Sequence, residues 1–300
     1  MRLIRAELLK ARRRTATWVL LIVALVATGL IYLLIGGFVL AISCAFGDFG
    51  QDQSSCIVEF PGAYALIDQF AFAAMGGLLA IVYAAALVGA DWNWGVLRNV
   101  IARGESRARY LLGKAAGLAI VLGIGALIVF FFAFLMTFVS AAIAGIPVSN
   151  PFRGNGLADL LINLFLGFLV ILERAALGFA VAVILRSQLA GAVVGIVLYL
   201  GEGIVRTSLT AAAVRDALGN GGFNGGLQVI GPEWFQYLPM NIGDQVLSAA
   251  PGVSGNLAAG GLEGIFLRPV PFEQALPALL IYLFVAIGVS IVALNRQEIV

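Results

Sequence analysis

The sequence predicts an all-α fold, a polytopic membrane helix bundle with six transmembrane helices and an N-terminal interfacial helix. The first observation is composition, because hydrophobic residues make up 61% of the 300 residues and charged residues only 11%, against about 25% charged in a soluble domain. A globule with so few charges could not cover its own surface, so most of the chain must face lipid. The second observation is a series of long apolar stretches without the alternation of barrel strands, which indicates helices. We expect residues 1–300 to form a single transmembrane domain.

The helix at residues 1–16 is predicted to lie in the membrane surface. On a helical wheel its apolar residues cluster on one face and most of its cations on the other, which is typical of a basic amphipathic helix beside anionic lipid. The alternative is that the positive charges only orient the first span. The charged residues of this helix that we single out are Arg5, Glu7, Lys10, Arg12 and Arg13.

Six apolar stretches come close to the roughly 20 residues that cross a bilayer as a helix. The predicted spans cover residues 17–40, 67–90, 115–142, 160–185, 188–205 and 275–294. A cleaved signal peptide is the alternative for the first, but its apolar stretch is too long and no A-x-A site follows.

The basic residues predict the orientation of the bundle. Most of the 18 Lys and Arg residues precede the first span or follow the second, so the positive-inside rule places both termini in the cytoplasm. Residues 91–114 then form a cytosolic loop and residues 206–273 a long extracytoplasmic loop. The latter is rich in Gly yet apolar, so we expect it to dip into the membrane edge or to pack as a lid, with short helices at 209–218 and 242–250. A disordered linker is the alternative.

The cytosolic loop has a helical pattern of its own. Apolar residues recur at helical spacing between residues 96 and 101, Gly104 fits a helix stop, and Ser106 fits the N-cap of a new helix that runs through Arg107. A short helix with an apolar face suits a docking partner. The alternative is that this face lies on the membrane surface.

Several motifs in this order resemble a known family. An acidic residue, Asp91, is followed by Trp94-Gly95-Val96-Leu97-Arg98, then Arg103-Gly104-Glu105-Ser106-Arg107, then Leu112-Gly113-Lys114. This pattern resembles the cytosolic loop of ABC-2-type transporter permeases, whose usual form is approximately E-x-x-x-G-T-L-R…R-x-x-S-R…G-K. Residues 2–14 and 237–241 are also similar to that family. The departures are Asp91 in place of Glu and Val96 in place of Thr.

The resemblance implies the membrane-spanning permease subunit of an ATP-driven exporter in the plasma (inner) membrane. Such permeases work as two six-helix subunits, a homodimer or a pair of related chains, each docked to a cytosolic ABC ATPase subunit that would bind ATP and Mg²⁺. The interfacial helix and the cytosolic loop would form the docking surface. The implied ATPase-coupling residues are Asp91, Trp94, Gly95, Leu97, Arg98, Arg103, Ser106, Arg107 and Lys114.

Chemistry within this chain is not expected. The sequence contains no His, which excludes Ser-His triads and His-ligated zinc. It has no P-loop, because Gly113-Lys114 is followed by Ala115 and preceded five residues earlier by Ala108. We therefore expect no catalytic residue, no metal site and no cofactor in this chain. Besides the ATPase and a second permease subunit, we expect it to contact membrane lipids, and we expect no nucleic acid partner.

Three further features are candidates for a structural or functional role. Glu173-Arg174 lies inside the fourth span, where charges are costly. Neighbours do not face each other on a helix, so we expect each to need a separate partner or water. The two residues are either a polar patch or gating ion pair in the transport path, or a structural pair that holds this helix to the bundle. Gly191 and Gly195 form a G-x-x-x-G motif for helix packing. Cys44 and Cys56 in the first outer loop can form a disulfide or stay free.

Other classes of function remain open from the residues alone. An ion-coupled secondary transporter could use Glu173-Arg174 as its coupling site, although no internal repeat is evident. A membrane-embedded enzyme is a second alternative, but the absence of His removes many protease mechanisms and no clustered carboxylates suggest a metal site. An ATPase-linked subunit that transmits motion to an extracytoplasmic partner is the third alternative.

Overall fold

The computed structural model describes residues 2–36, 67–93, 106–152, 154–219, 233–248 and 270–297, with residues 96, 100, 102 and 104 between them. Cys44 and Cys56 lie outside the described residues, as do Trp94, Gly95, Leu97, Arg98 and Arg103. The elements in chain order are α1 (Arg2–Arg13), α2 (Thr15–Ile31), η1 (Tyr32–Gly36), η3 (Asp68–Gly76), α5 (Gly77–Asn93), α7 (Arg107–Ala144), α8 (Gly156–Leu185), α9 (Gln188–Gly219), η5 (Glu233–Tyr237), α10 (Pro239–Ser248) and α12 (Phe272–Arg296).

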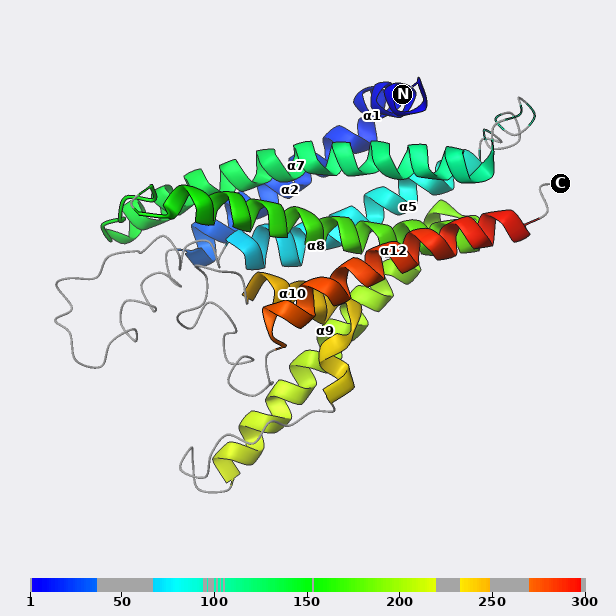
Figure 1. Cartoon of the computed structure of the whole chain (residues 1–300). Helices are drawn as coiled ribbons and strands as arrows, with labels where there is room; N and C mark the ends of the chain where they lie inside the picture. Colours follow the sequence, from blue (N-terminus) through cyan, green and yellow to red (C-terminus); the bar gives the residue numbers. More distant parts are fainter. Residues whose placement is uncertain are drawn as a thin grey trace.

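The described residues form a bundle of helices without strands (Figure 1). Six helices in the described part of the chain are long and apolar enough to cross a membrane, which confirms the predicted all-α fold with six candidate transmembrane helices. These spans are Thr15–Leu34, Ala71–Trp92, Arg107–Ala144, Gly156–Leu185, Gln188–Leu209 and Phe272–Arg296.

Helix α8 lies at the centre of the bundle, between α7 and α12 (Figure 1). Its buried face includes several small residues, among them Ala175, Gly178 and Ala182. A Cβ on Gly178 would lie 2.6 Å from the Ile81 carbonyl oxygen, so α5 and α8 approach each other at backbone distance. Small residues at helix contacts are the usual means of packing helices in lipid, where no hydrophobic effect drives them together.

Both ends of the chain lie at the same end of the bundle. The Arg107 guanidinium, at the start of α7, donates to the Leu294 carbonyl near the end of α12. Helix α1 crosses the long helices beside α7 (Figure 1), close enough that a Cβ on Gly117 would lie 2.9 Å from the Glu7 Cβ. We call this the termini end of the bundle, made of α1, the first turns of α7 and the last turns of α5, α8 and α12.

Helix α9 is longer than the sequence predicts. The expected span ends at residue 205 because Arg206 interrupts the apolar stretch, with a separate short helix at 209–218. In the structure α9 continues without a break to Gly219, so the prediction of a separate helix at 209–218 is wrong. The Arg206 side chain pairs with Asp244 of α10. Because this ion pair compensates the charge of Arg206, the helix can continue through that position.

Helix α10 packs part of the long connection between α9 and α12 onto the bundle. Its Met240, Ile242, Val246 and Leu247 side chains are buried, and α10 lies against α8 and α12. This segment therefore behaves as a packed element, and it carries polar groups to the side of α8.

Candidate functional site

Two polar clusters stand out in the apolar bundle. The termini-end cluster comprises Glu7, Lys10, Arg14, Asp91, Tyr110 and Lys114. The inner cluster comprises Glu173, Arg174, Tyr199, Glu202, Arg206, Asn241 and Asp244. Each joins residues from helices that are far apart in the sequence.

Asp91 is the centre of the termini-end cluster. It lies in the last turn of α5, is only 3% exposed, and accepts hydrogen bonds on Oδ2 from Lys114 Nζ and from Tyr110 OH of α7. Tyr110 and Lys114 are four residues apart, so they lie on one face of α7. Arg14 Nη2, at the joint between α1 and α2, lies 3.8 Å from Asp91 Oδ1. One buried carboxylate therefore ties α5, α7 and the α1–α2 joint together.

Ser106 and Arg107 fix the start of α7. Ser106 is its N-cap, and the Ser106 hydroxyl accepts from the Arg109 amide at 3.3 Å, as the sequence predicts. Arg107 donates to the carbonyls of Leu294 at 2.9 Å and Gln297 at 2.9 Å. A cation at a helix C-terminus satisfies carbonyls that have no partner within the helix. The start of α7 is thereby attached to the end of α12.

The same end of the bundle also connects to α8. The Gln297 side-chain amide donates to the Val183 carbonyl of α8 at 3.1 Å. The Arg186 guanidinium, just after α8, lies 5.7 Å from the centre of the Trp92 ring of α5, a distance suited to cation–π attraction. The two ends of the α5–α7 connection are thus held to the end of α12, to the end of α8 and to the α1–α2 joint.

Helix α1 turns Glu7 towards the bundle, whereas two of its cations are exposed. Glu7 is buried against α7, and its Oε1 pairs with Lys10 Nζ at 2.8 Å. Arg12 and Arg13 are exposed. Arg5 lies in α1, but its side chain is outside the described part of the structure.

Arg174 is the centre of the inner cluster and is fully buried. Its guanidinium donates to the Met240 carbonyl at 3.2 Å, to Asp244 Oδ1 at 2.5 Å, and to the Ala73 carbonyl. A Cβ on Gly77 would lie 2.5 Å from the Arg174 Cδ. Glycine at this position of α5 therefore makes room for the side chain.

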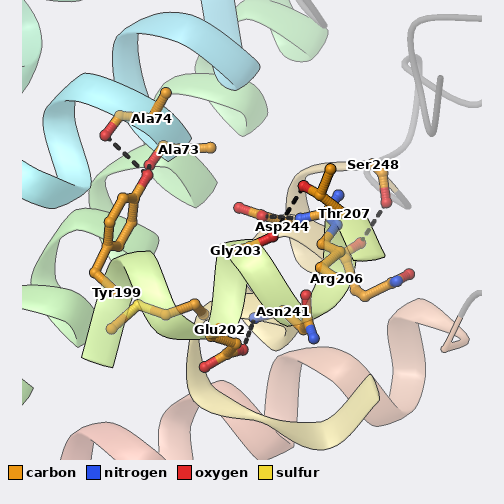
Figure 2. A network of polar contacts seen from close by, with 12 residues as sticks. Ala73, Ala74, Tyr199, Glu202, Gly203, Arg206, Thr207, Asn241, Asp244 and Ser248 are labelled. Carbon is orange, nitrogen blue, oxygen red and sulfur yellow. Dashed lines mark hydrogen bonds and ion pairs between the residues drawn. The ribbon is translucent and has the colours of Figure 1, made fainter. Parts of the chain in front are cut away.

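Asp244 bridges two arginines from different helices. Its Oδ1 accepts from Arg174 of α8 and its Oδ2 from Arg206 of α9. Figure 2 shows Arg206 beside Asp244. Charges are costly inside a membrane unless they are paired, and Asp244 supplies the pairing for both cations.

Tyr199 and Glu202 of α9 connect this helix to two further elements, η3 and α10. Tyr199 OH donates to the carbonyls of Ala73 and Ala74 at 3.0 Å each, in the π-helical turns of η3 (Figure 2). Glu202 Oε1 accepts from the Asn241 amide in the first turn of α10 at 2.6 Å. A carboxylate there satisfies an unpaired N–H and interacts favourably with the helix dipole.

Glu173 and Arg174 have different surroundings, as expected for neighbours on a helix. Adjacent residues point in different directions on a helix, and Arg174 is bound elsewhere. Glu173 is fully buried, and neither of its carboxylate oxygens has a hydrogen-bond partner among the described residues. Sequence reasoning missed Asp244 as the partner of Arg174; the available signal was two charges, Arg206 and Asp244, in weakly polar stretches.

Gly191 and Gly195 contact helices of the same chain. A Cβ on Gly191 would lie 2.6 Å from the Ala182 Cβ of α8, and one on Gly195 would lie 2.4 Å from Ile81 Cγ2 of α5. The motif therefore packs α9 against α8 and α5.

The described residues contain no group of three or more Cys, Asp or Glu side chains placed to hold a metal ion. The polar groups instead connect helices at two levels of the bundle.

Comparison with known proteins gives the family. No curated protein matches the sequence. The profile of the family described as ABC-2 family transporter protein matches residues 1–299, which is nearly the whole chain. The chain therefore belongs to the ABC-2 family of transporter proteins, as a multi-pass membrane component.

Proposed function

We propose that this chain is the permease subunit of an ATP-driven exporter in the plasma membrane. Two permease chains assemble, a separate ABC ATPase subunit binds ATP and Mg²⁺ at each, and both termini of the permease lie in the cytoplasm. Family membership and the six apolar helices support this proposal, and the distribution of basic residues supports the orientation.

The observation that carries the proposal is the anchoring of the α5–α7 connection at both of its ends. Asp91 precedes the connection and binds Lys114 beyond it, while Arg107 binds the end of α12. A force applied to the connection by an ATPase would therefore move α5, α7 and α12 together. The basic arm of α1 beside the same end adds to the surface available for docking.

Charge reversal in this connection tests the ATPase partner. We expect an ABC ATPase to co-purify with the affinity-tagged wild-type chain. It should be lost from Arg98→Glu/Arg103→Glu, because glutamates at these positions would repel an ATPase surface that is complementary to cations. The measurement is the ATPase-to-permease ratio on a gel after purification from native membranes.

The control is Arg153→Glu/Arg268→Glu, which reverses two charges predicted to lie on the opposite side of the membrane. It should retain the ATPase. If no ATPase accompanies the wild-type chain, the proposal fails and an ion-coupled transporter becomes the better candidate, since Glu173 is a buried carboxylate without a hydrogen-bond partner among the described residues.

A cysteine-labelling experiment tests the orientation. In a Cys44→Ser/Cys56→Ser background, Leu9→Cys in α1 should react with a membrane-impermeant maleimide only after the cells are opened, whereas Ser208→Cys in α9 should react in intact cells. Both positions are exposed in the structure. The reverse labelling pattern would contradict cytoplasmic termini.

A further inference from the structure

A cavity of about 510 Å³ lies between α1, α2, α5 and α7, outside both polar clusters. Its walls are apolar over most of their length. The residues that line its interior include Leu21, Ala24, Leu79, Val121 and Ile128. Pockets of this volume accommodate organic molecules, and this one is not filled by any described side chain.

One end of the cavity is polar. Arg12, at the end of α1, lines it together with Thr17, Trp18 and Tyr83. The Thr17 and Tyr83 hydroxyls are 3.2 Å apart, and Trp18 Nε1 donates to the Arg12 carbonyl at 3.0 Å. Trp and Tyr are enriched where a membrane meets water. The cavity therefore has a polar mouth at the level of α1 and an apolar interior beneath it.

The charge at the mouth is available for an external anion. Among the cations at this end of the described chain, Lys10 pairs with Glu7, and Arg14 lies near Asp91. No carboxylate among the described residues pairs with Arg12, which is exposed. A negatively charged group at the mouth would meet an arginine, a hydroxyl pair and the end of a basic helix.

We propose that this cavity binds one anionic phospholipid, with an acyl chain in the apolar interior and the phosphate headgroup at Arg12. The acyl chain would leave one apolar solvent for another, so its burial gains little. Which lipid is retained is therefore decided by the headgroup contact. An attraction between Arg12 and a net negative headgroup favours an anionic lipid over a zwitterionic one.

The structure offers a matched pair of substitutions that test occupancy of the interior. Gly125 of α7 lines the cavity, and a Cβ there would meet no heavy atom within 4 Å. Gly125→Phe should therefore fill the space that an acyl chain occupies without a backbone clash. Gly288 of α12 has equally open surroundings but does not line the cavity, so Gly288→Phe is the control.

The experiment counts bound lipids by native mass spectrometry. The full-length chain, purified in neutral detergent, is titrated separately with phosphatidylglycerol and phosphatidylcholine of identical acyl chains. We expect one tightly retained phosphatidylglycerol, bound about fivefold more tightly than phosphatidylcholine, which is the effect of one cation at a membrane surface. Gly125→Phe should lose this lipid and Gly288→Phe should keep it.

Charge variants provide a second, independent arm. Arg12→Gln should retain the lipid but bind both headgroups equally, whereas Arg13→Gln, which alters a neighbouring cation outside the cavity lining, should keep the preference. Equal lipid retention by Gly125→Phe and Gly288→Phe would overturn the proposal, and so would an undiminished preference in Arg12→Gln. If Gly125→Phe fails to fold, the Arg12 arm alone decides.

Discussion

Asp244→Asn is expected to produce the largest loss of stability of any single substitution in the inner cluster. Asparagine preserves the shape of the side chain and removes only its charge, which leaves the Arg174 and Arg206 cations facing one neutral group. Breaking a buried ion pair by removing one partner costs about 3–5 kcal/mol. Thermal unfolding of the purified protein in detergent, followed by tryptophan fluorescence, should show a markedly lower midpoint.

Removing one of the two cations should have a smaller effect. Arg206→Gln leaves the Asp244 carboxylate paired with Arg174, and Arg206 is itself only partly buried. The double variant Asp244→Asn/Arg206→Gln should be more stable than Asp244→Asn alone, because it removes one of the two cations that lose their ion pair with the Asp244 carboxylate. An unfolding midpoint of Asp244→Asn equal to that of the wild type would show that the bridge contributes nothing.

Sequence periodicity and length predict the membrane spans because they depend on local composition. An apolar stretch of about 20 residues has few alternatives to a transmembrane helix, and the N-cap at Ser106 follows from a local pattern. The ends of helices are harder to predict, as α9 shows. A charged residue such as Arg206 predicts the end of a span unless the residue that pairs with it is known.

The partner of Arg174 could not be predicted for the same reason. Asp244 lies 70 residues later in the chain, and the two meet only because α10 folds back onto α8. The sequence also does not show that the Ala73 and Ala74 carbonyls, in the π-helical turns of η3, accept from Tyr199. Local patterns determine elements, whereas these contacts depend on how elements pack.

Asp91→Asn is expected to destabilise the termini end of the bundle by about 3–5 kcal/mol. It leaves the Lys114 ammonium, only 2% exposed, without its counter-ion. Asp91→Glu keeps the charge, and we expect it to remain close to the wild type. Asp91→Asn/Lys114→Met should recover most of the loss, because the buried cation is gone and Asn can still accept from the Tyr110 hydroxyl.

The same variants separate positioning from docking. Asp91 is buried in the last turn of α5 and bound to Lys114 of α7, so it acts on an ATPase only through the positions of α5 and α7. ATPase binding should therefore be lost in Asp91→Asn and return with stability in Asp91→Asn/Lys114→Met. Arg98→Glu/Arg103→Glu should show the opposite combination, a wild-type unfolding midpoint without ATPase binding. If the stable double variant still fails to bind the ATPase, the Asp91 charge itself is needed at the docking surface, and the positioning role assigned to it here is wrong.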